Sequence, residues 1–316
     1  MWGTLLHAGL AGSFMKVPHV SAKKDALRST GAKAAVYGLP WDSTSISRTG
    51  ANFGPRAMRD VSCQFLMYNA DLDFDLSEAM ELVDCGDCEV VPANAERTFA
   101  RAQQDIGEIL DAGAIPVTLG GDHSVTIPAV RAVAERYKSA GLVLIDTHFD
   151  TSIDVAGETL NHCCPISRAV DAGFPPDKMV LIGMNGWQNP RSELEYCRTH
   201  GITVFGLRDV WRRGTEAVAA ETLSIAGNST DGIYLTVDID ALDSAFAPAT
   251  CTPTPGGMTA REMLDLVQAV SRGGLLGLDV VEVAPSLETS STTVKMGVRV
   301  VLDALAFHAG ARYPDE

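Results

Sequence analysis

The chain has 316 residues, of which 46% are hydrophobic and 21% charged, so it is long enough to bury the core of a large α/β domain. Its formal net charge is −15, so the phosphates of nucleic acid and anionic membrane surfaces would repel it. These values exclude nucleic acid and membrane as partners and favour small cationic molecules or divalent metal ions.

The first half of the chain alternates short apolar segments with amphipathic ones. The apolar segments are predicted to be buried strands at 34–39, 115–119 and 142–145. The helix predicted at Arg97–Ala112 carries apolar residues at helical spacing and ends at Gly113. A second helix is predicted at 128–137.

The second half continues this alternation. Its predicted strands are four short apolar runs at 179–183, 202–205, 233–237 and 275–278. Thr259 followed by Glu262 is a capping-box pattern for a helix that reaches Val270, and the last helix covers 293–307. Continuous apolar strands separated by amphipathic helices indicate a mostly parallel sheet covered on both faces. We therefore predict a three-layer αβα fold of the α/β class, with residues 1–316 forming a single domain.

Acidic residues and histidines follow three of the predicted strands. Residues 120–124 read Gly-Gly-Asp-His-Ser, residues 146–150 read Asp-Thr-His-Phe-Asp, and residues 238–240 read Asp-Ile-Asp. Because ligands of parallel sheets bind beyond the carboxyl ends of the strands, we expect these residues to gather on one rim. A single Asp or His at a strand end is usually a turn or capping residue, but three such groups together favour a functional site.

The spacing within the groups predicts how the side chains point. Residues i and i+2 of an extended segment face the same side, so Asp146, His148 and Asp150 are expected to point together, as are Asp238 and Asp240. So many acids and imidazoles would repel one another unless cations lay among them. The pattern therefore predicts two divalent ions. Mixed nitrogen and oxygen ligands suit Mn²⁺ or a neighbouring first-row ion better than a metal that prefers thiolates.

The three motifs resemble the signatures of the ureohydrolase (arginase/agmatinase) family, the third of them extending over residues 237–257. Residues 13–18 and 38–59 are similar to the N-terminal motifs of the agmatinase-like branch, and residues 279–285 (DVVEVAP) to the last active-site strand of the family. The resemblance covers nearly the whole chain. It implies an arginase-like version of the αβα fold and a C–N hydrolase that splits a guanidino compound into urea and an amine.

The resemblance also implies the site residues. The positions that match the family's metal ligands are His123, Asp146, His148, Asp150, Asp238 and Asp240. Asp146 and Asp238 would bridge two divalent ions, with Mn²⁺ the first expectation and Ni²⁺ the alternative, and a hydroxide held between the ions would attack the guanidinium carbon. Asp150 would carry a proton toward the leaving amine.

Two further catalytic residues follow from the same resemblance. Glu282 matches the carboxylate that pairs with the guanidinium group, and His162 matches a histidine that shuttles protons. From the residues alone, Glu282 is as readily a paired structural carboxylate, and His162 more often a loop histidine.

Departures from the family bear on the substrate. Cys163 and Cys164 stand where agmatinases have glycine and a small polar residue, and Asn185 where the family often has an arginine. With no positive group at Asn185 to hold a carboxylate, a cationic agmatine-like substrate is expected before a guanidino acid. A small or alkylated guanidine, or a biguanide, is the alternative, since Cys163 and Trp187 would fill space in the pocket.

Two other classes of protein fit the same fold. A non-catalytic partner subunit would be expected to have lost ligands, yet all six are present together with Glu282 and His162. A deacetylase-like hydrolase shares the architecture, but the Gly-Gly-Asp-His-Ser run favours the ureohydrolase branch.

Assembly and location are the remaining expectations. The resemblance implies a homo-oligomer, a trimer or hexamer, possibly with a related subunit. No apolar run reaches the roughly 18 residues that span a bilayer. The seven cysteines are scattered in a way that does not suggest a disulfide framework, so a cytoplasmic location is expected.

Overall fold

A computed structural model describes residues 12–314 of the chain. Its central strands are β1 (Ala34–Gly38), β4 (Leu82–Asp87), β5 (Ile115–Leu119), β6 (Ala140–Ile145), β7 (Met179–Ile182), β8 (Thr203–Phe205), β9 (Gly232–Asp238) and β10 (Leu275–Val281). They form one sheet in the order β4-β1-β5-β10-β9-β6-β7-β8, in which every neighbouring pair is parallel. The order brings β10, late in the chain, between β5 and β9.

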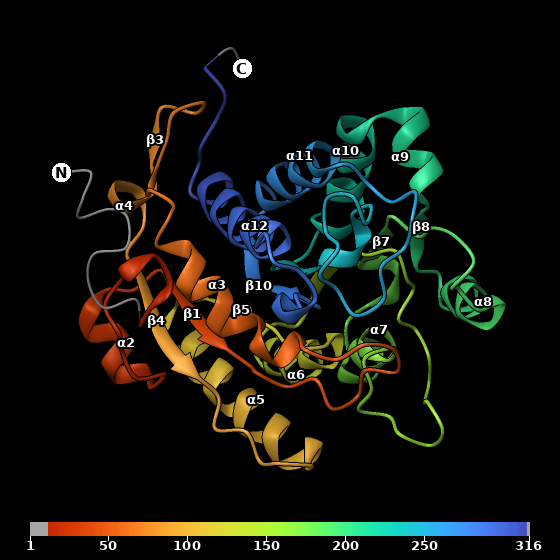
Figure 1. Ribbon diagram of the computed structural model, residues 1–316, viewed down its shortest axis with the longest axis horizontal. Coiled ribbons are helices and arrows are strands. Elements are labelled where there is room, and N and C mark those ends of the chain that lie inside the picture. The colour runs from red at the N-terminus through yellow and green to blue at the C-terminus, as the bar shows by residue number, and fades with distance from the viewer. Residues whose placement is uncertain (1–11, 315–316) are drawn as a thin grey trace.

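Helices cover both faces of the sheet (Figure 1). One layer contains α2 (Lys24–Thr30), α5 (Ala95–Ala112), α6 (Thr126–Ala134), α7 (Pro165–Ala172) and α8 (Arg191–His200). The other contains α3 (Gly54–Ser62), α9 (Leu207–Arg213), α10 (Thr215–Ala226), α11 (Ala260–Ser271) and α12 (Thr292–His308). The predicted three-layer αβα architecture with a parallel sheet is confirmed.

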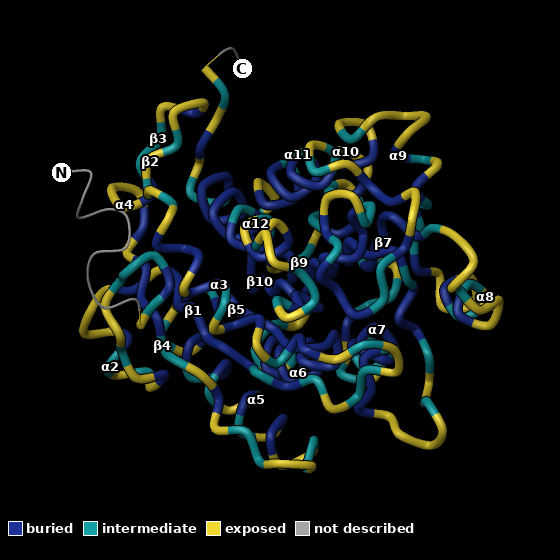
Figure 2. Tube along the Cα trace, viewed as in Figure 1, coloured by how far each residue is buried: buried dark blue, intermediate teal, exposed yellow. Residues whose placement is uncertain are grey.

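The strands are apolar along their whole length because both of their faces are buried. In β6, Val143 and Ile145 pack into the cluster under α10–α12, whereas Leu142 and Leu144 pack into the cluster under α5–α7. All four side chains are fully buried, and Figure 2 shows the same for the centre of the sheet. This two-sided burial explains why the strands read as continuous apolar runs rather than alternating ones.

The predicted elements agree with the structure to within a few residues. The Thr259 hydroxyl accepts a hydrogen bond from the Glu262 N–H at 3.2 Å, so the capping box that starts α11 is present. Strand β4 was not predicted, because only Leu82 and Val83 of its sequence (LVDCGD) are both buried and apolar.

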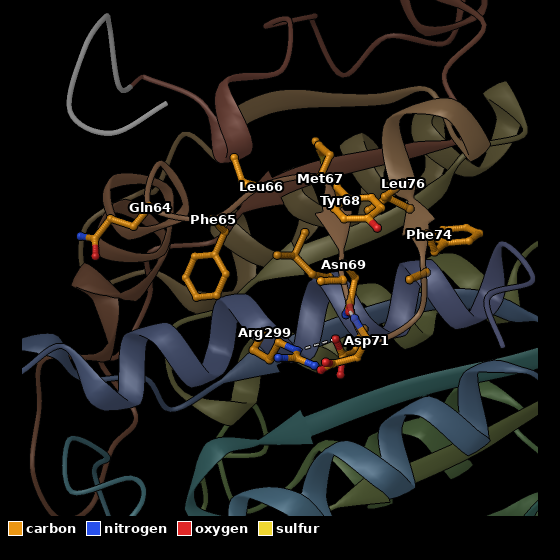
Figure 3. A pocket seen from close by; sticks show the side chains of 14 residues that line it. Gln64, Phe65, Leu66, Met67, Tyr68, Asn69, Asp71, Phe74, Leu76 and Arg299 are labelled. Carbon is orange, nitrogen blue, oxygen red and sulfur yellow. Dashed lines mark hydrogen bonds and ion pairs between the residues drawn. The ribbon is translucent and has the colours of Figure 1, made fainter. Parts of the chain in front are cut away.

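A small antiparallel hairpin of β2 (Tyr68–Asn69) and β3 (Phe74–Asp75), followed by α4 (Leu76–Ala79), projects beside α12. Between the hairpin and α12 lies a depression of about 350 Å³ that Arg299 borders (Figure 3). None of the predicted site residues lines it. Within residues 12–314, no helix combines the length and apolarity needed to cross a membrane.

Candidate metal centre

The predicted site residues meet at the carboxyl ends of four adjacent strands. His123 follows β5, Glu282 follows β10, Asp238 ends β9 and Asp146 follows β6. The sheet order alone therefore gathers residues that are up to 159 positions apart in the chain. This is the rim at which a parallel sheet is expected to bind its ligand.

Around His123, the first group of side chains is fully enclosed. The Nδ1 atom of His123 lies 3.1 Å from Asp146 Oδ2, 2.9 Å from Asp150 Oδ2 and 3.1 Å from Asp238 Oδ2. His123 and Asp146 have no exposed surface, and Asp238 has almost none. His123, Asp146 and Asp238 each offer a ligand atom within 4.8 Å of the others, a spacing suited to a single cation.

A second group shares one member with the first. His148 Nδ1 lies 3.4 Å from Asp146 Oδ1 and 3.2 Å from Asp240 Oδ2, and these three residues also offer mutually close ligand atoms. The two oxygens of Asp146 thus face different groups. Asp238, expected to bridge as well, is a member of the first group.

The backbone around these residues is not extended, so the expectation that their side chains alternate along strands is wrong. Strand β6 ends at Ile145, and the chain then bends, with Asp150 in the left-handed region at φ 51°. Asp240 lies in a 3-10 turn (Ile239–Ala241) that Asp238 caps by accepting the Asp240 N–H at 2.8 Å. Tight turns at the strand ends, not the two-residue repeat of a strand, bring the side chains together.

Several buried polar atoms in the two groups and in the neighbouring Glu282 lack hydrogen-bond partners. Within the described residues these include His123 Nδ1, Asp146 Oδ2, Asp240 Oδ1 and Glu282 Oε2. Buried polar atoms normally find partners, and here the acceptors approach the imidazole nitrogen without the geometry of hydrogen bonds. Donor atoms that converge on a shared point in this way fit divalent cations with nitrogen and oxygen ligands.

The buried carboxylates of these two groups also repel one another. Burial and the charges of Asp240 and Asp146 raise the pKa of Asp238 well above its usual value. Burial also raises the pKa of Asp240 to about 7, despite the opposing charge of His148. Positive charge between the groups would let these carboxylates remain ionised together.

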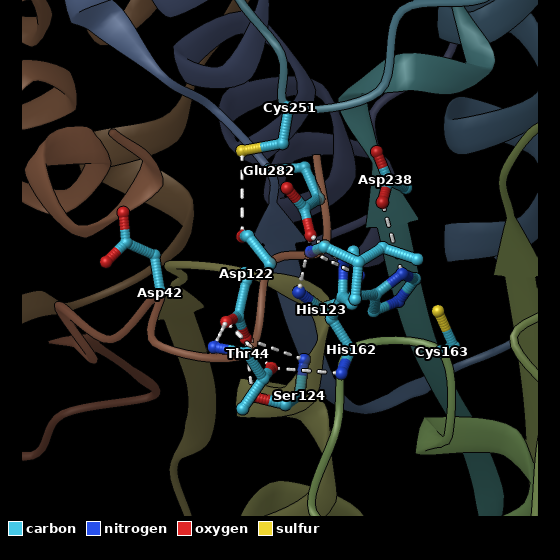
Figure 4. Close-up of polar contacts among 12 residues, drawn as sticks. Asp42, Thr44, Asp122, His123, Ser124, His162, Cys163, Asp238, Cys251 and Glu282 are labelled. Atoms are coloured by element: carbon cyan, nitrogen blue, oxygen red, sulfur yellow. Dashed lines mark hydrogen bonds and ion pairs between the residues drawn. The ribbon is translucent and has the colours of Figure 1, made fainter. Parts of the chain in front are cut away.

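Next to these groups, Glu282 and His162 form a buried pair (Figure 4). Glu282 Oε1 accepts the backbone N–H of His123 at 2.9 Å and lies 3.1 Å from His162 Nδ1. Burial lowers the pKa of His162, but hydrogen bonds to Cys163 and Glu282 outweigh it and raise the value to about 12. His162 Nε2 accepts the Ile46 N–H at 3.2 Å, so the ring carries its proton on Nδ1, facing Glu282. The lowered pKa of Glu282 keeps this carboxyl ionised, and its second oxygen, Oε2, has no hydrogen-bond partner among the described residues.

The sequence reasoning assigned no role to Asp122 and Thr44, which hold this region together (Figure 4). Asp122 Oδ2 accepts the Thr44 N–H at 3.0 Å and the Thr44 hydroxyl at 2.9 Å. The Thr44 hydroxyl oxygen in turn accepts the backbone N–H of His162 at 3.0 Å. These contacts fix the loop that carries His162 against the turn that carries His123. The Gly-Gly-Asp-His-Ser motif contains Asp122, and the motif at 38–59 contains Thr44.

A cavity of about 460 Å³ opens onto the two groups, with His148, Asp150, His162 and Glu282 in its wall. Glu193 of α8 also lines this cavity and was not predicted. It is 5% exposed, and burial raises the pKa of its carboxyl to about 7. Among the described residues that line the cavity, none is a lysine or arginine.

Of the residues that differ from the family pattern and were expected to shape the pocket, some line the cavity and others lie outside it. Cys163 lines the cavity as expected. The expectation that Trp187 fills the pocket is wrong, because its side chain is fully exposed and its neighbour Gln188 takes the place in the wall. Asn185 also lies outside the wall and donates to the Gly256 carbonyl at 2.9 Å.

Comparison with known proteins places this geometry in context. The model of the Arginase family matches residues 32–306. The mitochondrial agmatinase of Gallus gallus is 33% identical over 283 residues, covering 89% of this chain and 83% of that protein. The mitochondrial guanidino acid hydrolase of Homo sapiens is 33% identical over 87% of this chain and 78% of its own length. The solved structure of proclavaminate amidino hydrolase from Streptomyces clavuligerus superposes with a TM-score of 0.87 at 32% identity, covering 97% of this chain and 99% of that one.

Proposed function

This chain belongs to the arginase family and is a metal-dependent amidinohydrolase of a guanidino compound, and from that premise we propose that its substrate carries a cationic, agmatine-like tail. The observation that carries the proposal is the cavity wall, which holds members of both histidine–aspartate groups together with Glu282 and Glu193. Among the described residues that line it, none is a lysine or arginine. A guanidinium group and a second cation both suit such a wall.

The proposed ligands of the two divalent ions are His123, Asp146, His148, Asp150, Asp238 and Asp240. The short approaches between His123 and its three aspartates support the first position, and the His148–Asp240 approach supports the second. Asp146 serves both, since each of its oxygens faces a different histidine. Nitrogen and carboxylate donors favour Mn²⁺, with Ni²⁺ as the alternative.

When bound, the two ions supply Lewis acidity and lower the pKa of water toward neutrality. The protein's own residues then determine orientation and proton transfer. Glu282 Oε2, buried and without a hydrogen-bond partner in the described part of the chain, is positioned to accept a guanidinium N–H in a charge-assisted hydrogen bond. This carboxylate would hold the planar group against the two histidine–aspartate groups.

Proton transfer is assigned to His162 and Asp150. His162 holds a proton on the ring nitrogen that faces Glu282. A proton taken up from solvent at Nε2 would make the ring an imidazolium. The positive charge of a guanidinium at Glu282 would then favour release of a proton from the ring toward the leaving nitrogen. Asp150 lies in the same wall and is assigned the parallel role of carrying a proton to the leaving amine.

Glu193 is the residue that favours a cationic tail over the acidic tail of a guanidino acid. Its carboxyl is buried in the cavity wall with a pKa of about 7, and an ammonium group nearby would stabilise the ionised form. A substrate carboxylate would instead face Glu193 and the site aspartates. Cys163, which narrows the same wall, is the observation that keeps a small or alkylated guanidine as the second candidate.

Assembly, domain extent and location complete the proposal. We infer a homo-oligomer, a trimer or hexamer, possibly including a related subunit, and one ureohydrolase domain over residues 1–316. All seven cysteines lie in the described part of the chain and are free thiols, which supports a cytoplasmic location. Light scattering of the purified protein measures the subunit number.

The test is urea release from a panel of guanidino compounds by protein loaded with Mn²⁺ and, separately, with Ni²⁺. The panel contains agmatine, guanidinobutyrate, arginine, guanidine, methylated guanidines and biguanides. We expect the highest kcat/KM for agmatine. Higher activity on guanidinobutyrate would overturn the cationic tail, and higher activity on methylated guanidines would favour the second candidate.

A further inference from the structure

A row of buried polar side chains crosses the centre of the sheet behind the metal centre. Asp279 of β10 is in register with Thr236 of β9 and, on its other side, with Thr118 of β5. Asp279 and Thr236 have no exposed surface. An acid in the middle of a covered sheet is costly unless its oxygens are well bonded, so its presence in β10 needs a reason.

Two hydroxyl groups donate hydrogen bonds to Asp279. Its Oδ2 accepts the Tyr234 hydroxyl at 2.6 Å and the Thr126 hydroxyl at 2.9 Å. The Thr236 hydroxyl oxygen lies 3.4 Å from the Thr126 hydroxyl oxygen, and burial raises the pKa of Asp279. A carboxylate only accepts, so the hydroxyl hydrogens of Tyr234 and Thr126 point toward Asp279. Thr236 is therefore the donor in its contact with Thr126.

The shape of the sheet is adapted to this arrangement. The ring of Tyr234 crosses β10 at Gly277, where an added Cβ would lie 2.7 Å from the ring carbon Cε2. Glycine at position 277 therefore leaves the space that lets the Tyr234 hydroxyl reach Asp279.

The row ends on the far side of the His123 ring. His123 Nε2 lies 2.9 Å from Thr236 Oγ1, whereas Nδ1 faces Asp146, Asp150 and Asp238. Because the hydroxyl hydrogen of Thr236 is directed at Thr126, whose own hydrogen is directed at Asp279, only a lone pair of the Thr236 oxygen is available to His123. The Nε2 atom must then carry the ring proton and donate a hydrogen bond to Thr236. The Nδ1 atom is left with a lone pair that faces Asp146, Asp150 and Asp238.

We propose that Asp279 and Thr236 act as positioning residues, a relay that holds His123 with its proton on Nε2 and its Nδ1 lone pair directed at the first metal position. The inference rests on the proposed function, in which His123 is a metal ligand. Outer partners of ligating histidines fix the ring and its tautomer in this way. His148, the histidine of the second group, is outside this row and has 17% of its side chain exposed.

The relay is therefore specific to one of the two ions. Loss of Asp279 or of the Thr236 hydroxyl should lower the Mn²⁺ affinity of the His123 position by about 10- to 100-fold and leave the His148 position nearly unchanged. A simple loss of packing would weaken both positions together, since both groups share Asp146.

The experiment is a Mn²⁺ titration of chelator-treated full-length protein, followed by electron paramagnetic resonance, which separates a coupled pair of ions from a single one. The variants are Asp279→Asn, Thr236→Val and Thr236→Ser. We expect the wild type and Thr236→Ser to show the coupled pair, and Asp279→Asn and Thr236→Val to show a single ion over the same concentration range. Thr236→Val keeps the side-chain shape, so it answers the question even if Asp279→Asn fails to fold.

Two further variants separate the possible failures. Asp303→Asn removes another buried carboxylate, which lies in α12 and accepts a hydrogen bond from Gln268 Nε2 at 2.7 Å. This variant should retain both ions. His123→Ala should lose one ion. If His123→Ala keeps both ions at wild-type affinity, the proposed ligand set fails. If it loses one while folded Asp279→Asn and Thr236→Val keep both, the relay is wrong and the ligand set stands.

Discussion

The carboxylate of Glu282 accepts the backbone N–H of His123 at 2.9 Å, so the proposed guanidinium partner is tied to the main chain of a proposed metal ligand. A change in the position of either residue is passed to the other through this bond. The proposed cation sites and the proposed substrate carboxylate therefore form one rigid unit on the carboxyl ends of β5 and β10.

Replacement of Glu282 by Gln tests the substrate role of this unit. We expect kcat/KM to fall by about 10²- to 10³-fold, because the charge that pairs with the buried guanidinium is lost. Metal content, measured by inductively coupled plasma mass spectrometry, should stay at the wild-type value. Near-normal turnover in this variant would instead make Glu282 a structural carboxylate.

Asp146 and Asp240 should differ in their effect on metal content. Asp146 is shared by both groups, whereas Asp240 belongs to the second group alone. We expect Asp146→Asn to lose both ions and Asp240→Asn to lose one, as counted by metal analysis after equilibrium dialysis. Equal stoichiometry in the two variants would contradict the shared position of Asp146.

Glu193 should select the substrate tail. In Glu193→Gln, we expect kcat/KM for agmatine to fall by about 10- to 100-fold, the value of one charge-assisted hydrogen bond, while the value for tail-less guanidine stays unchanged. The matched control is Glu195→Gln on the same helix, where the side chain is 55% exposed and pairs with Arg191. If agmatine and guanidine respond equally to Glu193→Gln, the cationic tail does not reach this carboxylate.

Arg59 should contribute more to stability than any exposed ion pair of its helix. Its Nε donates to Asp84 Oδ2 at 2.8 Å and its Nη2 to Asp84 Oδ1 at 3.0 Å, with both side chains buried. Arg59→Met leaves the buried Asp84 carboxylate without its partner. We therefore expect the free energy of unfolding, measured in urea, to fall by about 3–5 kcal/mol. Arg56→Met, which removes an exposed pair with Asp60 at 3.9 Å, should cost less than about 1 kcal/mol.

His308 gives the fold a dependence on pH that its substitution should remove. Burial lowers the pKa of this histidine, and its Nδ1 accepts the Leu275 N–H at 3.0 Å, which requires an unprotonated nitrogen. The unfolded chain therefore binds the proton more readily, so this contribution to stability is present at higher pH and is lost as the pH falls below the ordinary value of about 6.5. His308→Gln keeps an acceptor for Leu275.

The measurement is the urea midpoint of wild type and His308→Gln at pH 7.5 and pH 5.5. The wild type should lose more stability between these values than the variant, and the carboxylates common to both proteins cancel in the comparison. An identical loss in the two proteins would show that His308 takes up no proton in this range.

The strands and the acidic motifs that follow them were predictable because each depends on neighbouring residues. An apolar run such as 142–145 reports burial on both faces, and Asp146 follows it directly. The gathering of these motifs followed from the general rule for parallel sheets. The position of β10 between β5 and β9 did not, because strand order is set by long-range packing.

The residues that were missed reach the site through tertiary structure. Glu193 lies on α8, where its sequence looks like an ordinary solvent-facing helix, and only packing buries it in the cavity wall. Asp279 reads as one polar residue in an apolar strand, and its partners come from β9 and α6. Trp187 was placed in the pocket from its size, yet the turn that carries it leaves it exposed.

Asp150 and Glu282 both have backbones in the left-handed region, at φ 51° and 63°. A residue with a Cβ is disfavoured there by roughly 1–3 kcal/mol, and glycine would relieve the strain. A search for substitutions that raise the melting temperature would therefore be drawn to these two corners of the chain. Glycine at either position would give a more stable protein that lacks a carboxylate from the wall of the cavity. Stability engineering should therefore leave both positions unchanged.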